Sequence, residues 1–597
     1  MREVMRATIG TDFLNEVNVK QMMPHSAAAT LADLAQSFWA LRCHEEPLFA
    51  IRAGVRPPSV VVFREGEEDH ARRYAGARSI LRQLGAISET DLTGQDWATY
   101  RLLRWDLESI ERFYEAKVHQ RTSLFPFGPE YAAVEFVNSV TLSSVERAEE
   151  YLVRLRSLPS YFRDVIGNLT LGHAAGFRYP RQVLAGAVAT VSTYMDGPLG
   201  QSPWLGPFHR APKSDSAIQK IASAASEFVA TKLLPTLRTY VEFLSGPLSV
   251  GARDSISCRD ADQGEDLYHL LVSHFTTLSL SGREVHEIGL AEVARLTAEM
   301  LPVAADAGFG TDLAAYRRYL STDRSFIASS KDVLLEEFEN LSKRIDLRVP
   351  EFFGKIPNAP YVIQLIPEAA AALLSTAYAE PSTSDGSSSG VFWVTSLTRR
   401  APSYIHIPLA LHEGWPGHLM HLVLAEQMDA LPQFRRFGAA FAGAWRYSAC
   451  CEGWALYCEG LGIDMGLYET PHQHFGRLEM EMMRALRLVA DTGLHAMGWS
   501  RSQTIDYMNA HQAQHPDTII AEVDRYIGMP GQALSYQIGN LKFRELRRRA
   551  EQRLGPRFDL RAYHDQLMAA GLVTLPVLER LVEEYIDLAA VAGSREG

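Results

Sequence analysis

The sequence predicts a mainly α-helical fold with a small β-sheet, and two observations carry this prediction. Amphipathic stretches with apolar residues at helical spacing recur along the chain, whereas runs typical of strands are few. The helical stretches are Val145–Leu158, Ala217–Leu244, Val285–Leu301, Arg477–His495 and Leu541–Leu554. The strand candidates are a weak one at Ser59–Phe63 and stronger ones at Tyr361–Ile366 and Val391–Val394.

Length and composition indicate a large core without an obvious linker. The chain has 597 residues, of which 47% are hydrophobic. No Pro/Gly/Ser-rich stretch cuts it and no internal repeat is visible. We therefore expect a single unit over residues 1–597, with a mainly helical N-terminal part at 1–350 and a C-terminal part at 351–597. The serine-rich run Ser382–Ser389 is expected to be a solvated loop rather than a flap.

Several absent features bear on compartment and partners. The first ten residues lack the apolar core of a signal peptide, and no run of about 18 apolar residues suggests a membrane span. Five cysteines in so long a chain do not resemble a disulfide framework. The net charge of −12, without a basic stripe, disfavours nucleic acid. We expect a cytoplasmic protein that binds neither membrane nor nucleic acid; its oligomeric state stays open.

The residues that carry chemistry gather near position 412. The chain reads His412-Glu-Gly-Trp-Pro-Gly-His418, and a glutamate, Glu452, follows within a helix-like segment. Imidazoles and a carboxylate are ordinary zinc ligands, and a catalytic zinc keeps a further position for water. Glu413, beside the first histidine, is then placed to take a proton from that water. This pattern predicts a zinc hydrolase.

The spacing of the two histidines requires a break in the helix. Histidines four apart share one helical face, but His412 and His418 are six apart, which rotates them about 120° away from each other. Pro416 and Gly417 lie between them, and both residue types disturb a regular helix. We expect a bulged or broken turn that brings His418 round to the metal.

Other metal-binding or His-Glu patterns are weaker. His421, three residues after His418, is an alternative ligand. Cys450, Cys451 and Cys458 flank Glu452, but their spacing is not that of a zinc finger, and buried thiols are common in cores. The second His-Glu pair, at His286, has no partner histidine nearby and is expected on a helix surface.

Four motifs in order carry a resemblance to a known family. They are Leu411–Leu419, Cys451–Glu459, Asp491–Trp499 and Asp524–Gly539. They resemble a bacterial family known as domain of unknown function 885, which is grouped with the thermolysin-like (gluzincin) zinc metallopeptidases. The resemblance reaches back to His286–Arg295 and forward to Phe558–Asp565, and is densest in the second half. The family usually has glutamine where this chain has His421.

The resemblance implies a helical peptidase-like fold with a deep cleft and the small sheet next to the zinc helices, in which residues 351–597 are the catalytic part. His412, His418 and Glu452 would hold Zn²⁺, and Glu413 would be the general base. Glu459 would orient a ligand histidine. In gluzincins a sheet edge pairs with the extended substrate, and Val391–Val394 is the candidate edge.

Further residues are expected around the substrate. An oxyanion needs a donor besides the metal: Tyr536 is the first choice, because a tyrosine in this position recurs in related peptidases, with Tyr526 and His495 behind it. Arg525 is expected to pair with a substrate carboxylate. Its rivals are Arg484 and Arg487.

The expected activity is therefore zinc-dependent hydrolysis of a peptide or another amide, by an oligopeptidase or a carboxypeptidase. Two alternatives stay open. Two histidines and a carboxylate also ligate iron in non-haem oxygenases, although Glu413 beside His412 favours a hydrolase. The fold could instead serve binding, or a biosynthetic reaction on a modified amino acid or small molecule.

Overall fold

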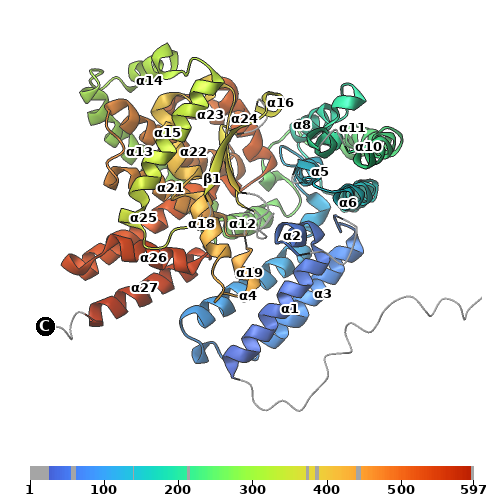
Figure 1. Ribbon diagram of the computed structural model, residues 1–597, viewed down its shortest axis with the longest axis horizontal. Coiled ribbons are helices and arrows are strands. Elements are labelled where there is room, and N and C mark those ends of the chain that lie inside the picture. Colours follow the sequence, from blue (N-terminus) through green and yellow to red (C-terminus); the bar gives the residue numbers. More distant parts are fainter. Residues whose placement is uncertain are drawn as a thin grey trace, which may run out of the picture.

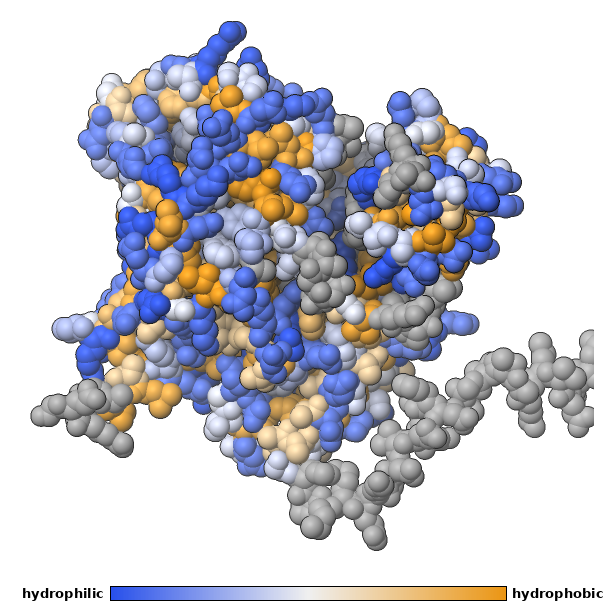
Figure 2. Space-filling model, in the orientation of Figure 1, coloured by the Kyte–Doolittle hydropathy of each residue, from blue (hydrophilic) through white to orange (hydrophobic). Residues whose placement is uncertain are grey.

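The computed structural model describes residues 26–55, 62–138, 140–211, 215–358, 360–371, 375–382, 389–438 and 446–592. Figure 1 shows a helical body with one small sheet and a lobe of helices α5–α11 to one side. The predicted mainly α-helical fold with a small sheet is confirmed. Figure 2 shows a notch in the surface between the lobe and the body. The deep cleft itself stays a prediction.

The first half of the chain is helical, with short 3₁₀ segments between the helices. The N-terminal group comprises α1 (Ala27–Glu45), α2 (Pro47–Arg52), α3 (Glu67–Leu84) and α4 (Gly94–Glu115). The lobe comprises α5 (Pro129–Asn138), α6 (Val145–Leu155), α7 (Leu158–Ala174), α8 (Arg181–Thr193), α9 (Gly206–Arg210), α10 (Ser216–Phe228) and α11 (Leu234–Ser245). Then follow α12 (Gly264–Thr276), α13 (Gly282–Asp306), α14 (Leu313–Thr322) and α15 (Lys331–Phe352).

The second half contains the sheet and the helices of the metal motif. The sheet region comprises β1 (Tyr361–Leu365), α16 (Glu368–Ala371), β2 (Ala377–Glu380) and β3 (Gly390–Val394). The helices after it are α17 (His406–Glu413), α18 (His418–Glu426), α19 (Gln433–Arg436), α21 (Ser448–Asp464), α22 (Pro471–His495), α23 (Arg501–His511), α24 (Pro516–Gly528), α25 (Ser535–Leu554), α26 (Leu560–Ala570) and α27 (Leu575–Ala592).

Local sequence explains where the long helices begin. Ser281 and Glu284 form a reciprocal capping box at the start of α13, which satisfies two of the free N–H groups of the first turn. Thr470 and Gln473 do the same for α22, whose first residue is Pro471. The five helical stretches expected from periodicity lie within α6–α7, α10–α11, α13, α22 and α25.

The sheet differs from the expectation in its order. The strands are arranged β1-β3-β2; β3 is parallel to β1 and antiparallel to β2. The expectation that Val391–Val394 is an edge was therefore wrong, because β3 is the central strand. Gly390, Phe392 and Val394 are buried and alternate with the half-buried Val391 and Trp393, so one face of this strand packs on the core. The edge strand β2 contacts both α17 and α18. Of the weak candidate at Ser59–Phe63, residues 59–61 lie outside the described part, and Val62 and Phe63 form no strand.

The largest apolar core joins the two ends of the chain. It extends from Leu31 in α1 to Ile586 in α27 and includes Phe392 of β3 and Trp454 of α21. A second core fills the lobe and takes in Val523 of α24. A third joins α13, α14 and α22. His286 belongs to this packed region: it is 8% exposed, and its Nδ1 lies 2.8 Å from Oγ1 of Thr492. Its expected place on a helix surface was wrong.

None of the described helices is long and apolar enough to cross a membrane.

Two glycines allow α21 and α25 to touch. A Cβ atom on Gly453 would lie 2.4 Å from Cα of Gly539, and one on Gly539 would lie 1.9 Å from the carbonyl oxygen of Ala449. Since α21 carries Glu452 and Glu459, this contact fixes the helix on which the metal motif depends.

Gly453→Ala is expected to lower the free energy of unfolding by about 1–3 kcal/mol, because backbone atoms would have to separate. Gly460→Ala, in the same helix with open space around it, is the matched control and should be neutral or slightly stabilising. Chemical denaturation measures both variants. Equal stability of the two would show that α21 and α25 are not in close contact.

A buried glutamate in the lobe makes stability depend on pH. Glu130 is fully buried, and neither of its carboxylate oxygens has a hydrogen-bond partner among the described residues. Burial raises its pKa from 4.5 to about 8. Between these values the folded protein holds a proton that the unfolded chain has lost. Stability therefore falls as pH rises through this window, by about 1.4 kcal/mol per pH unit.

Glu130→Gln is expected to remove this slope. The variant should match the wild type near pH 5 and exceed its melting temperature increasingly up to pH 8. Glu149→Gln, at an exposed position of α6, is the control and should follow the wild type. A difference between Glu130→Gln and wild type that does not grow with pH would contradict the account.

Candidate metal centre

The chain between the two motif histidines breaks the helix as expected. α17 ends at Glu413 and α18 begins at His418. A Cβ atom on Gly417 would lie 2.0 Å from the carbonyl oxygen of His412, so only glycine fits this close return of the chain. The indole Nε1 of Trp454 donates to the carbonyl oxygen of Pro416 at 2.9 Å. α21 thereby holds the break in place.

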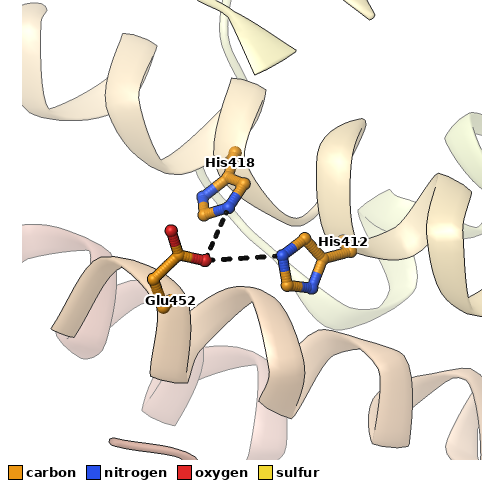
Figure 3. Close-up of side chains that lie close together, drawn as sticks. All are labelled: His412, His418 and Glu452. Carbon is orange, nitrogen blue, oxygen red and sulfur yellow. Dashed lines mark ion pairs between the residues drawn. The ribbon is translucent and has the colours of Figure 1, made fainter. Parts of the chain in front are cut away.

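Three side chains converge at this break. His412 and His418 approach the carboxylate of Glu452 from two different helices, as Figure 3 shows. Oε2 of Glu452 lies 3.5 Å from Nε2 of His412 and 3.3 Å from Nε2 of His418. One potential ligand atom from each residue lies within 4.8 Å of the others. Among the described residues, this is the one group of three or more His, Cys, Asp or Glu side chains close enough to share a metal ion.

The two histidines are oriented by different partners. Nδ1 of His412 donates to Oε1 of Glu459 at 2.8 Å, which leaves Nε2 facing Glu452. Glu459 is in turn 3.4 Å from Nη2 of Arg484. The expected role of Glu459 in orienting a ligand histidine fits this geometry. The neighbour of His418 is a thiol and not a carboxylate, because its Nδ1 lies 3.5 Å from Sγ of Cys451.

The electrostatics of the three residues favour a bound cation. Burial alone would lower the pKa of His412, but hydrogen bonds to Glu452 and Glu459 outweigh it and raise the pKa to about 9. Burial alone would raise the pKa of Glu452, but the charges and hydrogen bonds of His418 and His412 pull it well below its usual range. Without a metal, the site therefore attracts a proton to the His412 imidazole and keeps the Glu452 carboxylate ionised.

The structure separates His418 from its alternative His421. Nε2 of His421 lies 3.4 Å from the carbonyl oxygen of Gly571, and its Nδ1 is buried without a partner among the described residues. Burial lowers the pKa of His421 to about 4. His421 is thus a neutral core histidine that faces α26, and the structure brings His418 to Glu452 instead.

The cysteines around Glu452 form no thiolate site in the described part of the chain. Cys450, Cys451 and Cys458 are free and buried. Burial raises the pKa of the Cys450 thiol to about 12 and raises those of Cys451 and Cys458 well above their usual range. All three are therefore neutral thiols, which are poor metal ligands.

Glu413 directly follows His412 and is 7% exposed. No hydrogen bond ties its carboxyl group to any of the described residues. Burial raises its pKa, against the lowering effect of His412 and His418. A carboxyl group that is untethered and has a raised pKa, next to a metal centre, is suited to accept and release a proton.

Tyr536 lies one turn before Gly539 on α25, and Gly539 packs against Gly453, the neighbour of Glu452. The guanidinium of Arg487 lies over the Tyr536 ring at 4.4 Å. Burial and then the charge of Glu452 raise the pKa of the Tyr536 phenol, so the phenol stays protonated. The donor role of Tyr536 stays a prediction.

The other expected donors are occupied within the protein. The N–H of Cys258 donates to Nδ1 of His495, and Nε2 of His495 donates to the carbonyl oxygen of Tyr526. Both ring nitrogens thus serve the backbone, which disfavours the donor role expected for His495. The hydroxyl of Tyr526 donates to Glu522 at 2.7 Å, which disfavours its oxyanion role as well.

Glu522 is the residue that the sequence analysis missed. It pairs with both Arg487 and Arg525, so each expected substrate arginine already has a protein partner. The signal was present in the sequence, because Glu522, Arg525 and Tyr526 lie at i, i+3 and i+4 on one helix and therefore face the same side.

Comparison with known proteins identifies the family. Residues 47–582 match the model of a family described as "Bacterial protein of unknown function (DUF885)", and the chain belongs to this family. No curated protein matches. A crystal structure of a candidate lipoprotein from Colwellia psychrerythraea is similar with a TM-score of 0.85 and 25% identity, over 94% of this chain and 98% of that one. A candidate lipoprotein of unknown function from Shewanella oneidensis is similar with a TM-score of 0.70 and 16% identity, over 93% and 99% of the two chains.

Proposed function

We propose that the protein is a zinc-dependent hydrolase of peptide or peptide-like amide bonds, of the gluzincin type. The observation that carries the proposal is the separation of the ligand atoms. Zinc lies about 2.0–2.2 Å from nitrogen and oxygen ligands in a tetrahedral site, so two of its ligands lie about 3.3 Å apart. The two histidine–Glu452 separations are 3.5 and 3.3 Å.

The residues fit zinc in other respects as well. Two neutral imidazoles with one carboxylate are a common catalytic donor set, and Glu459 fixes the ring orientation of His412. When bound, zinc would supply a Lewis acid and lower the pKa of water. The same donors suit iron, but the position of Glu413 directly after His412 favours hydrolysis.

The protein's own groups supply the proton transfers. Glu413 would accept a proton from the attacking water and deliver it to the leaving amine. Burial raises the pKa of Glu413, which makes its carboxylate a better acceptor of the proton from water. Tyr536 would donate from its phenol to the oxygen on which negative charge develops.

The sheet offers a place for an extended substrate. β2 is an edge strand that contacts α17 and α18, and among the described residues it pairs with β3 on one side only. A peptide could add to this edge through main-chain hydrogen bonds. β2 thus takes the role first expected of Val391–Val394.

Cytoplasmic location stays a prediction; similarity to candidate lipoproteins raises an envelope location as the competing proposal.

One experiment tests metal and reaction together. The purified full-length protein is stripped of metal, reloaded separately with zinc or ferrous iron, and incubated with a defined peptide library. Mass spectrometry then reads the products. We expect one zinc per chain and products that differ from substrates by addition of water. Oxidised products that appear only with iron, or a zinc-loaded protein that hydrolyses no amide, would contradict the proposal.

A further inference from the structure

Four hydrogen-bond donor contacts converge on one oxygen of Glu522. Oε2 lies 3.2 and 2.9 Å from Nε and Nη2 of Arg487, 3.1 Å from Nη2 of Arg525 and 2.7 Å from the hydroxyl of Tyr526. Oε1 is 3.2 Å from Nε of Arg525. A carboxylate oxygen has two lone pairs. The number of donors around Oε2 is therefore about twice the number of its lone pairs.

The same cluster carries a surplus of positive charge. Arg487 and Arg525 bring two charges against the one of Glu522. Asp491 acts on Arg525 only from beyond ion-pair distance, and its oxygens accept from the hydroxyl of Tyr268 and the N–H of Gly531. A buried guanidinium without a counter-charge in contact is costly. Among the described residues, the two arginines thus share one carboxylate at ion-pair distance.

An anion could reach the cluster. The side chains of Arg487, Arg525 and Glu522 are 9%, 11% and 19% exposed, so they are desolvated without being sealed. Partial desolvation strengthens a charge-assisted hydrogen bond with an incoming ligand.

The cluster lies beside the metal centre. Arg484 and Arg487 are three residues apart on α22, which places them on neighbouring turns of one face, about 4.5 Å apart along the axis. Arg484 contacts Glu459, the partner of His412. Arg487 stacks on Tyr536, which lies one turn before Gly539 on α25, and Gly539 packs against Gly453, the neighbour of Glu452. A short molecule could therefore contact the metal centre and the arginines together.

We propose that Arg487 and Arg525 bind the α-carboxylate at the C-terminus of the substrate, sharing their donors between it and Glu522. The inference rests on the proposed function and narrows it to a carboxypeptidase. Anchoring the terminal carboxylate near the metal places the last amide at the reacting position. Hydrolysis breaks that C–N bond and forms a C–O bond from water, and a proton passes to the amine of the released amino acid.

The first test compares peptides of identical sequence with a free or an amidated C-terminus, using the zinc-loaded protein. We expect release of the last residue from the free acid. The amide should have a kcat/KM lower by about 10–100-fold, the worth of one or two charge-assisted hydrogen bonds. Equal rates on both peptides, or internal cleavage of both, would overturn the inference while leaving amide hydrolysis in place.

The second test removes one arginine. Arg487→Met keeps a long unbranched side chain against the Tyr536 ring but removes the guanidinium. Glu522 retains Arg525 and Tyr526 as partners. The ratio of free-acid to amide kcat/KM should fall toward one. Arg317→Met, which removes a single buried ion pair with Glu479 at 2.6 Å, is the matched control and should keep the wild-type ratio. An unchanged ratio in Arg487→Met would overturn the inference. If that variant fails to fold, Arg487→Lys, which keeps the charge without the planar fork, replaces it.

The third test needs neither metal nor turnover. N-acetylphenylalanine and its amide are titrated into the metal-free protein and followed by calorimetry. The acid should bind and the amide should bind at least about 10-fold more weakly. If the acid binds more tightly than the amide but the zinc-loaded protein hydrolyses no peptide, the proposed function is refuted and the carboxylate site is retained. Hydrolysis without preference for the acid in binding would refute the carboxylate site and keep the function.

Discussion

Glu413→Gln is expected to reduce amide hydrolysis by at least about 10²–10⁴-fold, the usual contribution of a general base. The loss should reach the upper end or exceed it, because the same carboxylate also returns the proton to the amine. Glutamine keeps the size of the side chain and its hydrogen-bonding capacity but cannot take up a proton. Steady-state kinetics on the substrate found with the peptide library measures the loss.

The variant should otherwise resemble the wild type. The carboxyl group of Glu413 makes no hydrogen bond to a described residue, and it lies outside the set of ligand atoms that converge on the candidate metal position. Zinc content and melting temperature should therefore stay near the wild-type values. Loss of zinc would make Glu413 a ligand, and unchanged turnover would remove it from the mechanism.

Glu452→Gln is expected to weaken zinc binding by more than about 100-fold, since loss of a residue that merely orients a ligand already costs 10–100-fold. Glu452 contributes the negative charge of the donor set and faces both imidazoles. Competition with a chromophoric chelator measures the affinity. A variant with full zinc affinity and full activity would show that Glu452 is not the third ligand.

Two histidine variants provide the matched comparison. His418→Ala should lose the metal, whereas His421→Ala, three residues along the same helix, should keep it. His421 faces Gly571, so its removal should lower stability without changing zinc affinity. The reverse pattern would make His421 the ligand and would require a different path of the chain at Gly417.

Much of the architecture could be predicted from local patterns. Helical periodicity located α13, α22 and α25, because long amphipathic stretches of this kind are dictated by local spacing. The distorted turn at Pro416 and Gly417 could be predicted because six-residue spacing excludes a straight helix. The three potential ligands could be named because few residue types bind zinc and they occurred together in one motif.

What could not be predicted depends on contacts between distant segments. The expectation of an edge at Val391–Val394 was wrong because β2 (Ala377–Glu380), which covers one side of this strand, has a weak strand signal in the sequence. His495 was assigned a donor role because its backbone partners, at Cys258 and Tyr526, are 237 and 31 residues away in the sequence. The ion pairs of Arg487 and Arg525 within the protein could not be predicted because Glu522, which holds both, was overlooked on the helix of Arg525.

The central claim is that two imidazoles and one carboxylate hold zinc at the break between α17 and α18. X-ray absorption spectroscopy of the zinc-loaded protein tests it most directly, since it reports the number and type of ligand atoms. We expect two histidine nitrogens, further oxygen ligands at about 2.0–2.2 Å and no sulfur. A zinc–sulfur distance of about 2.3 Å, or a shell without imidazole, would contradict the assignment of His412, His418 and Glu452.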